Sequence, residues 1–189
     1  NVTVVADGQS VTFNEFTITL FKPFTTHNFY DAAVGNVIDS AMIIESDGVS
    51  AFNANDNTPT PEACAMLRER FGTIDLAMIN YNAAGPYPAC FDNLSPAEKM
   101  AEHHRILDRN MQYMIELLGV LQPRACLPFA GAYVLGGSKS VKNPYLGTTT
   151  WDACAEYLRS HDAPCEVVTL REGTTLDLAT MQADRPYEP

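Results

Sequence analysis

The chain has 189 residues, which is enough for one domain with a sizeable core. Acidic residues outnumber basic ones by 23 to 12, and the resulting net charge of -11 argues against a protein that binds nucleic acid or an anionic membrane surface. The five cysteines include no C-x-x-C pair, and no apolar run approaches the roughly 18 residues of a membrane span. We therefore expect free thiols and a cytoplasmic protein, without a disulfide framework, a zinc knuckle or a membrane segment.

The first part of the chain is predicted to form two antiparallel hairpins. Residues 1–24 and residues 36–55 each combine β-rich segments with a D-G turn, at Asp7-Gly8 in the first and at Asp47-Gly48 in the second. Because the chain begins within this strand pattern, we expect the sequence to be a piece of something longer.

Helices and strands then alternate. Residues 60–72 have a Thr60 cap, Pro61 in the first turn and Gly72 as a stop, which predicts a helix, and residues 73–81 are predicted as a buried strand. Residues 95–120 are predicted as a second helix that opens with a capping box of Ser95 and Glu98. Its apolar residues recur three, four or seven apart and predict one buried stripe: Met100, Leu107, Met111, Met114 and Leu118.

The C-terminal third continues the same alternation. Residues 124–137 are predicted as a strand entering a Gly-rich turn, residues 149–161 as a helix with Thr149 and Asp152 in capping-box spacing, and residues 165–170 as a last strand. The order of elements predicts a single α/β domain over residues 1–189, with a mixed sheet.

Asp56 is the first candidate for chemistry, because it follows a strand and is flanked only by small, uncharged residues. A carboxylate in such a place usually has a partner, most often a metal ion, a basic side chain or backbone N–H groups. His27 lies 29 residues earlier, and the hairpin between them could bring the two together as metal ligands. The alternatives are that Asp56 is an ordinary turn residue and that His27 is a structural loop histidine.

The other three histidines are predicted to be structural. His103 and His104 are adjacent on a helix and point about 100° apart, so they cannot both face one ion. His161 lies near a helix end, where it suits the helix dipole.

The loop of residues 80–91 is the second candidate, because prolines and small residues stand among aromatic ones after a buried strand. We expect Tyr81, Asn82, Tyr87 and Cys90 to shape the rim of a pocket that binds a small-molecule substrate. The alternative is a rigid turn that buries its aromatic side chains, with Cys90 as an inert thiol.

Four parts of the chain, taken in order, resemble the metallo-β-lactamase fold, and in particular its C-terminal half. They are His27, residues 35–57, residues 75–91 and residues 123–137. The chain looks most like the metallo-β-lactamase-like part of CMP-N-acetylneuraminate hydroxylase, in which a strand ending in N-D and a loop with G-Y-P precede a P-F-A-G segment.

This resemblance implies the C-terminal portion of an αββα sandwich, in which two β-rich halves pack sheet against sheet with helices outside. His27 and Asp56 match metal ligands of the second half, and zinc, iron or manganese would activate water that attacks an ester, lactone, amide or phosphodiester. Two features depart from the family pattern. Ala130 stands where many hydrolases of this fold have a histidine, and the H-x-H-x-D-H motif of the first half is absent.

The resemblance therefore implies part of a metal-dependent hydrolase, completed by a missing N-terminal half or by homodimer formation, with no metal or only weakly bound metal in this chain alone. Two alternatives stay open. The chain could be a non-catalytic module that binds a ligand or partner and has lost the metal site, or an accessory domain of an oxygenase.

Overall fold

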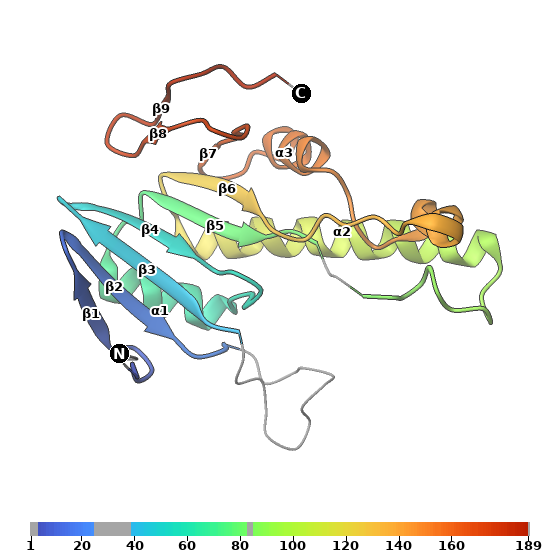
Figure 1. Ribbon diagram of the computed structural model, residues 1–189, viewed down its shortest axis with the longest axis horizontal. Coiled ribbons are helices and arrows are strands. Elements are labelled where there is room, and N and C mark those ends of the chain that lie inside the picture. Colours follow the sequence, from blue (N-terminus) through green and yellow to red (C-terminus); the bar gives the residue numbers. More distant parts are fainter. Residues whose placement is uncertain (1–3, 25–38, 83–84, 189) are drawn as a thin grey trace.

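The computed structural model describes residues 4–24, 39–82 and 85–188 (Figure 1). The strands and helices follow in the order β1 (Ser10–Phe13), β2 (Phe16–Phe21), β3 (Ala41–Ser46), β4 (Val49–Asn53), α1 (Pro61–Phe71), β5 (Leu76–Asn80), α2 (Pro96–Leu121), β6 (Ala125–Phe129), the 3-10 helix η1 (Gly137–Tyr145), α3 (Trp151–Ser160), β7 (Glu166–Val167), β8 (Leu176–Asp177) and β9 (Gln182–Ala183).

The seven strands β1 to β7 form one sheet in their chain order. Strands β1 to β4 pair antiparallel, whereas β4 to β7 pair parallel. Strands β8 and β9 form a separate antiparallel pair. The predicted α/β class with a mixed sheet is therefore confirmed. None of the helices in the described ranges is both long enough and apolar enough to cross a membrane.

One of the two predicted hairpin turns is correct and the other is wrong. Asp47 and Gly48 join β3 to β4 with φ of 49° and 78°, which is the left-handed geometry that a two-residue turn needs. The turn between β1 and β2 lies instead after Phe13, where Asn14 has φ of 52°. Asp7-Gly8 precedes β1 and does not join it to β2. Gly8 N donates to the carbonyl of Leu20 on β2, so Gly8 extends the pairing of β1 with β2.

The main core lies between the sheet and the three α-helices. Alternate residues of the strands face the helices, and buried side chains of α1, α2 and α3 pack on them. The most buried large side chains of this core include Ile43, Phe52, Leu67, Ile79, Met114, Leu118 and Leu158.

The predicted capping box of α2 is confirmed, since Ser95 Oγ accepts from Glu98 N and the Glu98 carboxylate accepts from Ser95 N. The predicted apolar stripe is correct only in its C-terminal half, because Met100 and Leu107 are half-exposed. The N-terminal half of α2 extends past the edge of the sheet and lies beside η1 (Figure 1). Helix α3 begins one residue later than predicted, with Thr150 as its cap in place of Thr149.

The opposite face of the sheet is apolar and only partly covered. In-register pairs place Ile18 beside Ile44, and Leu20 beside Met42, and all four side chains are half-buried. At the other side of this face, the C-terminal segment with β8 and β9 packs on the sheet. That second cluster is formed by Leu76, Ala125, Val168, Leu170, Leu176, Leu178 and Met181, together with neighbouring sheet residues.

A partly buried ion pair fixes the C-terminal segment to the sheet. Asp75, which is 8% exposed, accepts hydrogen bonds from Ser50 N at 2.8 Å and from Arg124 Nη1 at 2.7 Å. The same guanidinium donates to the carbonyl oxygens of Leu178 and Ala179. The Arg124 side chain thus links Asp75, just before β5, to the C-terminal segment that crosses the sheet. These hydrogen bonds orient the C-terminal segment.

Candidate functional site

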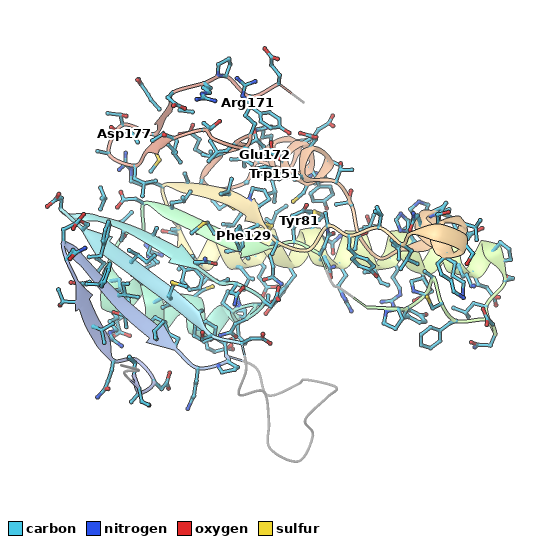
Figure 2. The ribbon with its side chains drawn as sticks, viewed as in Figure 1. Tyr81, Phe129, Trp151, Arg171, Glu172 and Asp177 are labelled. Carbon is cyan, nitrogen blue, oxygen red and sulfur yellow. The ribbon has the colours of Figure 1, made fainter. Side chains whose placement is uncertain are left out.

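Three loops meet at the carboxyl ends of the parallel strands β4, β5 and β6. Ligands of open α/β sheets commonly bind at this edge, where loops follow neighbouring strands. Asp56 follows β4, Tyr81 and Asn82 follow β5, and Ala130 follows β6. Tyr81 and Phe129 mark this edge in Figure 2, and the pairing of Asn80 with Phe129 shows that β5 and β6 end together.

Asp56 lies in a tight turn directly after β4. Asn55 adopts a left-handed conformation with φ of 51°, and its N–H donates to Asn53 Oδ1 at 2.8 Å. Asp56 is exposed, and within the described ranges its carboxylate forms no hydrogen bond or ion pair. The side chain is therefore free to accept a cation, but its role as a metal ligand stays a prediction.

Asn57, not Asp56, is the buried polar residue of this loop, with 2% of its surface exposed. Asn57 Oδ1 accepts from Phe24 N at 2.7 Å, and its Nδ2 donates to the carbonyl of Lys22 at 3.1 Å. This amide joins the loop after β4 to the chain that leaves β2. Sequence reasoning missed Asn57, although an asparagine next to a strand-end aspartate was a visible signal.

His27 falls outside the described residues, so its predicted pairing with Asp56 stays a prediction. In the described part of the chain, no three His, Cys, Asp or Glu side chains gather closely enough to hold a metal ion. A catalytic zinc ion needs three protein ligands and one open position. The described residues by themselves therefore do not fit a metal ion.

Tyr81 and Asn82 are interior residues, 5% and 6% exposed. Burial raises the pKa of Tyr81 to about 12, with smaller contributions from Cys154 and Asp152. Asn82 Nδ2 donates to the Thr149 carbonyl and its Oδ1 accepts from Thr149 N, both at 2.9 Å. Asn82 thus holds the residues that precede α3 against the end of β5.

The segment after β6 runs against the backbone of Asn82. Ala130 has φ of 54° and Gly131 has φ of 105°, so both adopt conformations that residues with a side chain rarely take. A Cβ atom at Gly131 would lie 2.8 Å from the Cβ of Asn82, which explains why only glycine fits there. The P-F-A-G segment therefore fixes the chain path at this edge of the sheet.

Tyr87 contacts α2. Its hydroxyl donates to Glu102 Oε2 at 2.7 Å, and its ring packs edge-on to Phe91 with centroids 4.9 Å apart. Arg105 forms an ion pair with Glu102 at 2.6 Å. Hydrogen bonds from Arg105 and from Tyr87 lower the pKa of Glu102 to about 2, and the same contact with Glu102 raises the pKa of Tyr87.

Cys90 is exposed and lines an open, mainly apolar pocket of about 240 Å³. The pocket walls are formed by Gly85, Pro86, Cys90, Tyr133, Leu135 and Leu146. Tyr133 closes one side, since its hydroxyl donates to the Gly85 carbonyl at 2.8 Å. Of the four residues predicted to shape a pocket, Cys90 lines this one, and Tyr81, Asn82 and Tyr87 do not. The tyrosine in the pocket wall is Tyr133, which follows β6.

The structural roles expected for the other three histidines stay predictions, and two of these histidines have contacts within the fold. A ring nitrogen of His103 hydrogen-bonds the Leu146 carbonyl, and His104 is exposed. His161 follows α3, where its ring stacks on Tyr157 with centroids 3.9 Å apart.

Two curated relatives share part of the sequence, whereas no protein-family profile matches. The relatives, from two strains of Mycobacterium tuberculosis, both carry the name "Putative Rieske 2Fe-2S iron-sulfur protein". Each is 32% identical over 88 residues, which is 45% of this chain but only 17% of the relative. The chain thus spans less than a fifth of these relatives.

Two solved structures are similar in fold. A point mutant of CmlA β-hydroxylase superimposes with a TM-score of 0.54 at 15% identity, covering 90% of this chain and 33% of CmlA. A "Putative metal-dependent hydrolase" from Parabacteroides distasonis gives 0.52 at 15% identity, covering 89% of this chain and 57% of the hydrolase. CmlA is a diiron enzyme of the metallo-β-lactamase fold. The fold of this chain is metallo-β-lactamase-like. The particular likeness to CMP-N-acetylneuraminate hydroxylase stays a prediction.

Proposed function

We propose that this chain is the C-terminal portion of a metal-dependent enzyme of the metallo-β-lactamase fold. Its metal centre would lie at the carboxyl ends of β4 to β6, with Asp56 and His27 as ligands and the remaining ligands outside this chain. The observation that carries the proposal is the fold shared with two larger proteins, one named a putative metal-dependent hydrolase and the other a β-hydroxylase.

The contacts of Asn57 support the pairing of Asp56 with His27. Asn57 Oδ1 accepts a hydrogen bond from Phe24 N at 2.7 Å, and His27 comes three residues after Phe24 in the sequence. A chain of three residues spans at most roughly 10–11 Å. Asp56 is the immediate neighbour of Asn57, so chain length allows the proposed pairing of the two candidate ligands.

The exposed part of the apolar sheet face supports the presence of a second half. Phe13 and Phe16 are 65% and 37% exposed at the far edge of this face, and Ile18, Leu20, Met42 and Ile44 are half-buried beside them. A contiguous apolar surface of this kind usually marks an interaction site. We propose that the N-terminal half of the sandwich covers it, and that a homodimer forms through the same face where that half is absent.

Hydrolysis is the first candidate reaction, supported by the fold shared with the Parabacteroides protein. The substrate would be a small molecule with an ester, lactone, amide or phosphodiester bond, and the loop that carries Tyr87 and Cys90 would form one wall of its site. We propose that the ligands that complete the metal site lie in the part of the enzyme outside this chain.

Oxygenation is the second candidate, and the sequence relatives are the specific observation that favours it. Their name describes an iron–sulfur protein, and CmlA is a β-hydroxylase. In this case the chain would be part of an oxygenase that carries an iron–sulfur centre elsewhere in its chain.

The ligand assignment is tested by the metal content of the full-length gene product. We expect the Asp56→Ala variant to lose at least half of the metal bound per chain. Asp108→Ala serves as the control, because Asp108 is an exposed aspartate on α2, outside the proposed site. Unchanged stoichiometry in Asp56→Ala would sink the assignment, and a full-length protein without metal would favour the non-catalytic module.

The reaction class is tested on the same preparation. A hydrolase should cleave chromogenic esters, lactones or phosphodiesters without dioxygen and contain no acid-labile sulfide. An oxygenase should contain iron and acid-labile sulfide and consume dioxygen only with a reductant.

A further inference from the structure

The pocket of about 240 Å³ beside Cys90 is formed by three segments that are far apart in the sequence. Its lining residues are Gly85, Pro86 and Cys90 after β5, Tyr133 and Leu135 after β6, and Leu146 after η1. The surface of the pocket is mainly apolar, and none of these six described residues carries a charge. Such a lining suits an uncharged, apolar group rather than an ion.

The polar atoms of these wall residues are largely occupied by one another. The Tyr133 hydroxyl donates to the Gly85 carbonyl at 2.8 Å, and the Pro86 carbonyl accepts from Cys90 N at 2.8 Å. The Cys90 thiol is only a weak hydrogen-bonding group. Water in this pocket therefore finds few partners, and an apolar group that displaces such water gains affinity.

Hydrogen bonds also fix the wall segments to one another. Asn143 Oδ1 accepts from Leu135 N at 2.8 Å, and Asn143 Nδ2 donates to the Leu135 carbonyl at 3.1 Å. Leu146 N donates to the Asn143 carbonyl at 3.2 Å, and Leu146 forms an isolated antiparallel bridge with Pro88. Because the walls are already ordered, binding of a ligand requires little further ordering of the chain.

The volume of the pocket sets the size of the group that fits. A cavity of about 150 Å³ lined by Leu, Ile and Phe side chains is enough for benzene. Pockets that hold whole drug-sized ligands measure roughly 300–1,000 Å³. At about 240 Å³, this pocket has room for one aromatic ring with a small substituent. The ring of Tyr133 in the wall adds an aromatic contact, which favours a ring over an aliphatic chain of the same size.

The pocket lies beside the edge of the sheet where β5 and β6 end. Gly85 follows Asn82 by three residues and Tyr133 follows Gly131 by two, so each lies within roughly 10–11 Å of the chain at this edge. A Cβ atom at Gly131 would lie 3.4 Å from the carbonyl oxygen of Asn82, so the two loops run against each other where they leave the sheet.

We propose that this pocket is the subsite that receives an uncharged aromatic ring of the small-molecule substrate. The assignment rests on the proposed function, since it names one part of the substrate of that enzyme. The ring binds because its carbon surface is buried against Pro86, Tyr133, Leu135 and Leu146, and this step needs no metal and no covalent bond. Binding of the ring is therefore measurable separately from metal binding and from turnover.

Alkylation of Cys90 in the full-length gene product reports whether the pocket is occupied, because Cys90 is exposed and lines it. Benzyl alcohol is the probe, since it is an uncharged aromatic ring with one small substituent. Iodoacetamide labels the thiol, and peptide mapping by mass spectrometry gives the rate. We expect the rate at Cys90 to fall along a saturating curve, with a Kd in the millimolar range that is typical of so small a ligand. Ethanol at the same concentrations should leave the rate unchanged.

Two neighbouring substitutions test the lining. Leu135→Asp places a charge in the pocket wall and should abolish the protection of Cys90 by benzyl alcohol. Val134→Asp is the matched control, because Val134 is 80% exposed and lies outside the wall, and it should keep the protection. In the wild-type protein, the partly exposed Cys165 lies outside the pocket, and its alkylation should not respond to the probe. This last comparison needs no variant and covers the case in which Leu135→Asp does not fold.

The subsite is overturned if benzyl alcohol leaves the alkylation rate of Cys90 unchanged, if it slows Cys165 equally, or if a folded Leu135→Asp protein keeps full protection. The proposed function fails in a different measurement, when Asp56→Ala keeps its metal. Either result stands whatever the other shows, so the two failures are distinguishable.

Discussion

Replacing Asn57 with alanine should destabilise the protein by about 3 kcal/mol. The variant loses two hydrogen bonds, from Phe24 N and to the Lys22 carbonyl, each with a net contribution of about 1 kcal/mol. It also leaves the Phe24 N–H without an acceptor, and because this group is only partly buried the added cost is about 1 kcal/mol, the low end for an unsatisfied donor. Asn57 is 2% exposed, so water cannot readily replace the lost side chain.

Thermal unfolding followed by circular dichroism measures this effect. A loss of about 3 kcal/mol corresponds to a fall in Tm of roughly 6–12 °C for a domain of this size. Asn53→Ala is the matched control, because the Asn53 amide accepts one exposed hydrogen bond in the same loop and its loss should cost less than about 1 kcal/mol. Equal midpoints for the two variants would refute the claim that Asn57 anchors the loop that carries Asp56.

Three further variants test other contacts. Gly131→Ala should lower Tm by several degrees in the same assay, because the added Cβ would meet the Cβ of Asn82 at 2.8 Å and φ is 105°. Asp75→Asn should cost about 2 kcal/mol in urea unfolding, since its buried carboxylate accepts hydrogen bonds from Ser50 on β4 and from Arg124 just before β6. Hydrogen bonds from Arg105 and Tyr87 lower the pKa of Glu102 from 4.5 to about 2 in the folded protein. The Glu102 carboxylate therefore stabilises the fold above about pH 4.5, and this contribution is lost as the pH falls from 4.5 towards 2. The difference in Tm between wild type and Glu102→Gln should be constant at neutral pH and should shrink between pH 4.5 and pH 2.

Local signals predicted most of the elements correctly because they depend on neighbouring residues. The caps at Thr60 and Ser95 satisfy N–H groups three residues away, and the turn at Asp47-Gly48 depends on two backbone angles. The first hairpin turn was predicted wrongly because D-G is only a local preference. The pairing of Phe13 with Phe16 decides the turn, and that pairing belongs to the whole sheet.

The candidate site was harder to predict because its residues come from distant parts of the chain. Tyr81 could equally have been a rim residue or a core residue, and its burial follows from the packing of α3. Tyr133 was missed because the loops that form the pocket meet only after β5 and β6 have paired. The pairing of His27 with Asp56 stays a prediction.

By itself, the sequence determined the α/β class, the helix starts and the mixed sheet, because apolar periodicity and capping act within a few residues. The tertiary structure alone decided which polar side chains became interior anchors, as Asn57 and Asn82 did, and which stayed exposed, as Asp56 did. The physical reason is that burial and long-range hydrogen bonding depend on strand register and on the chain segments that cross each face of the sheet.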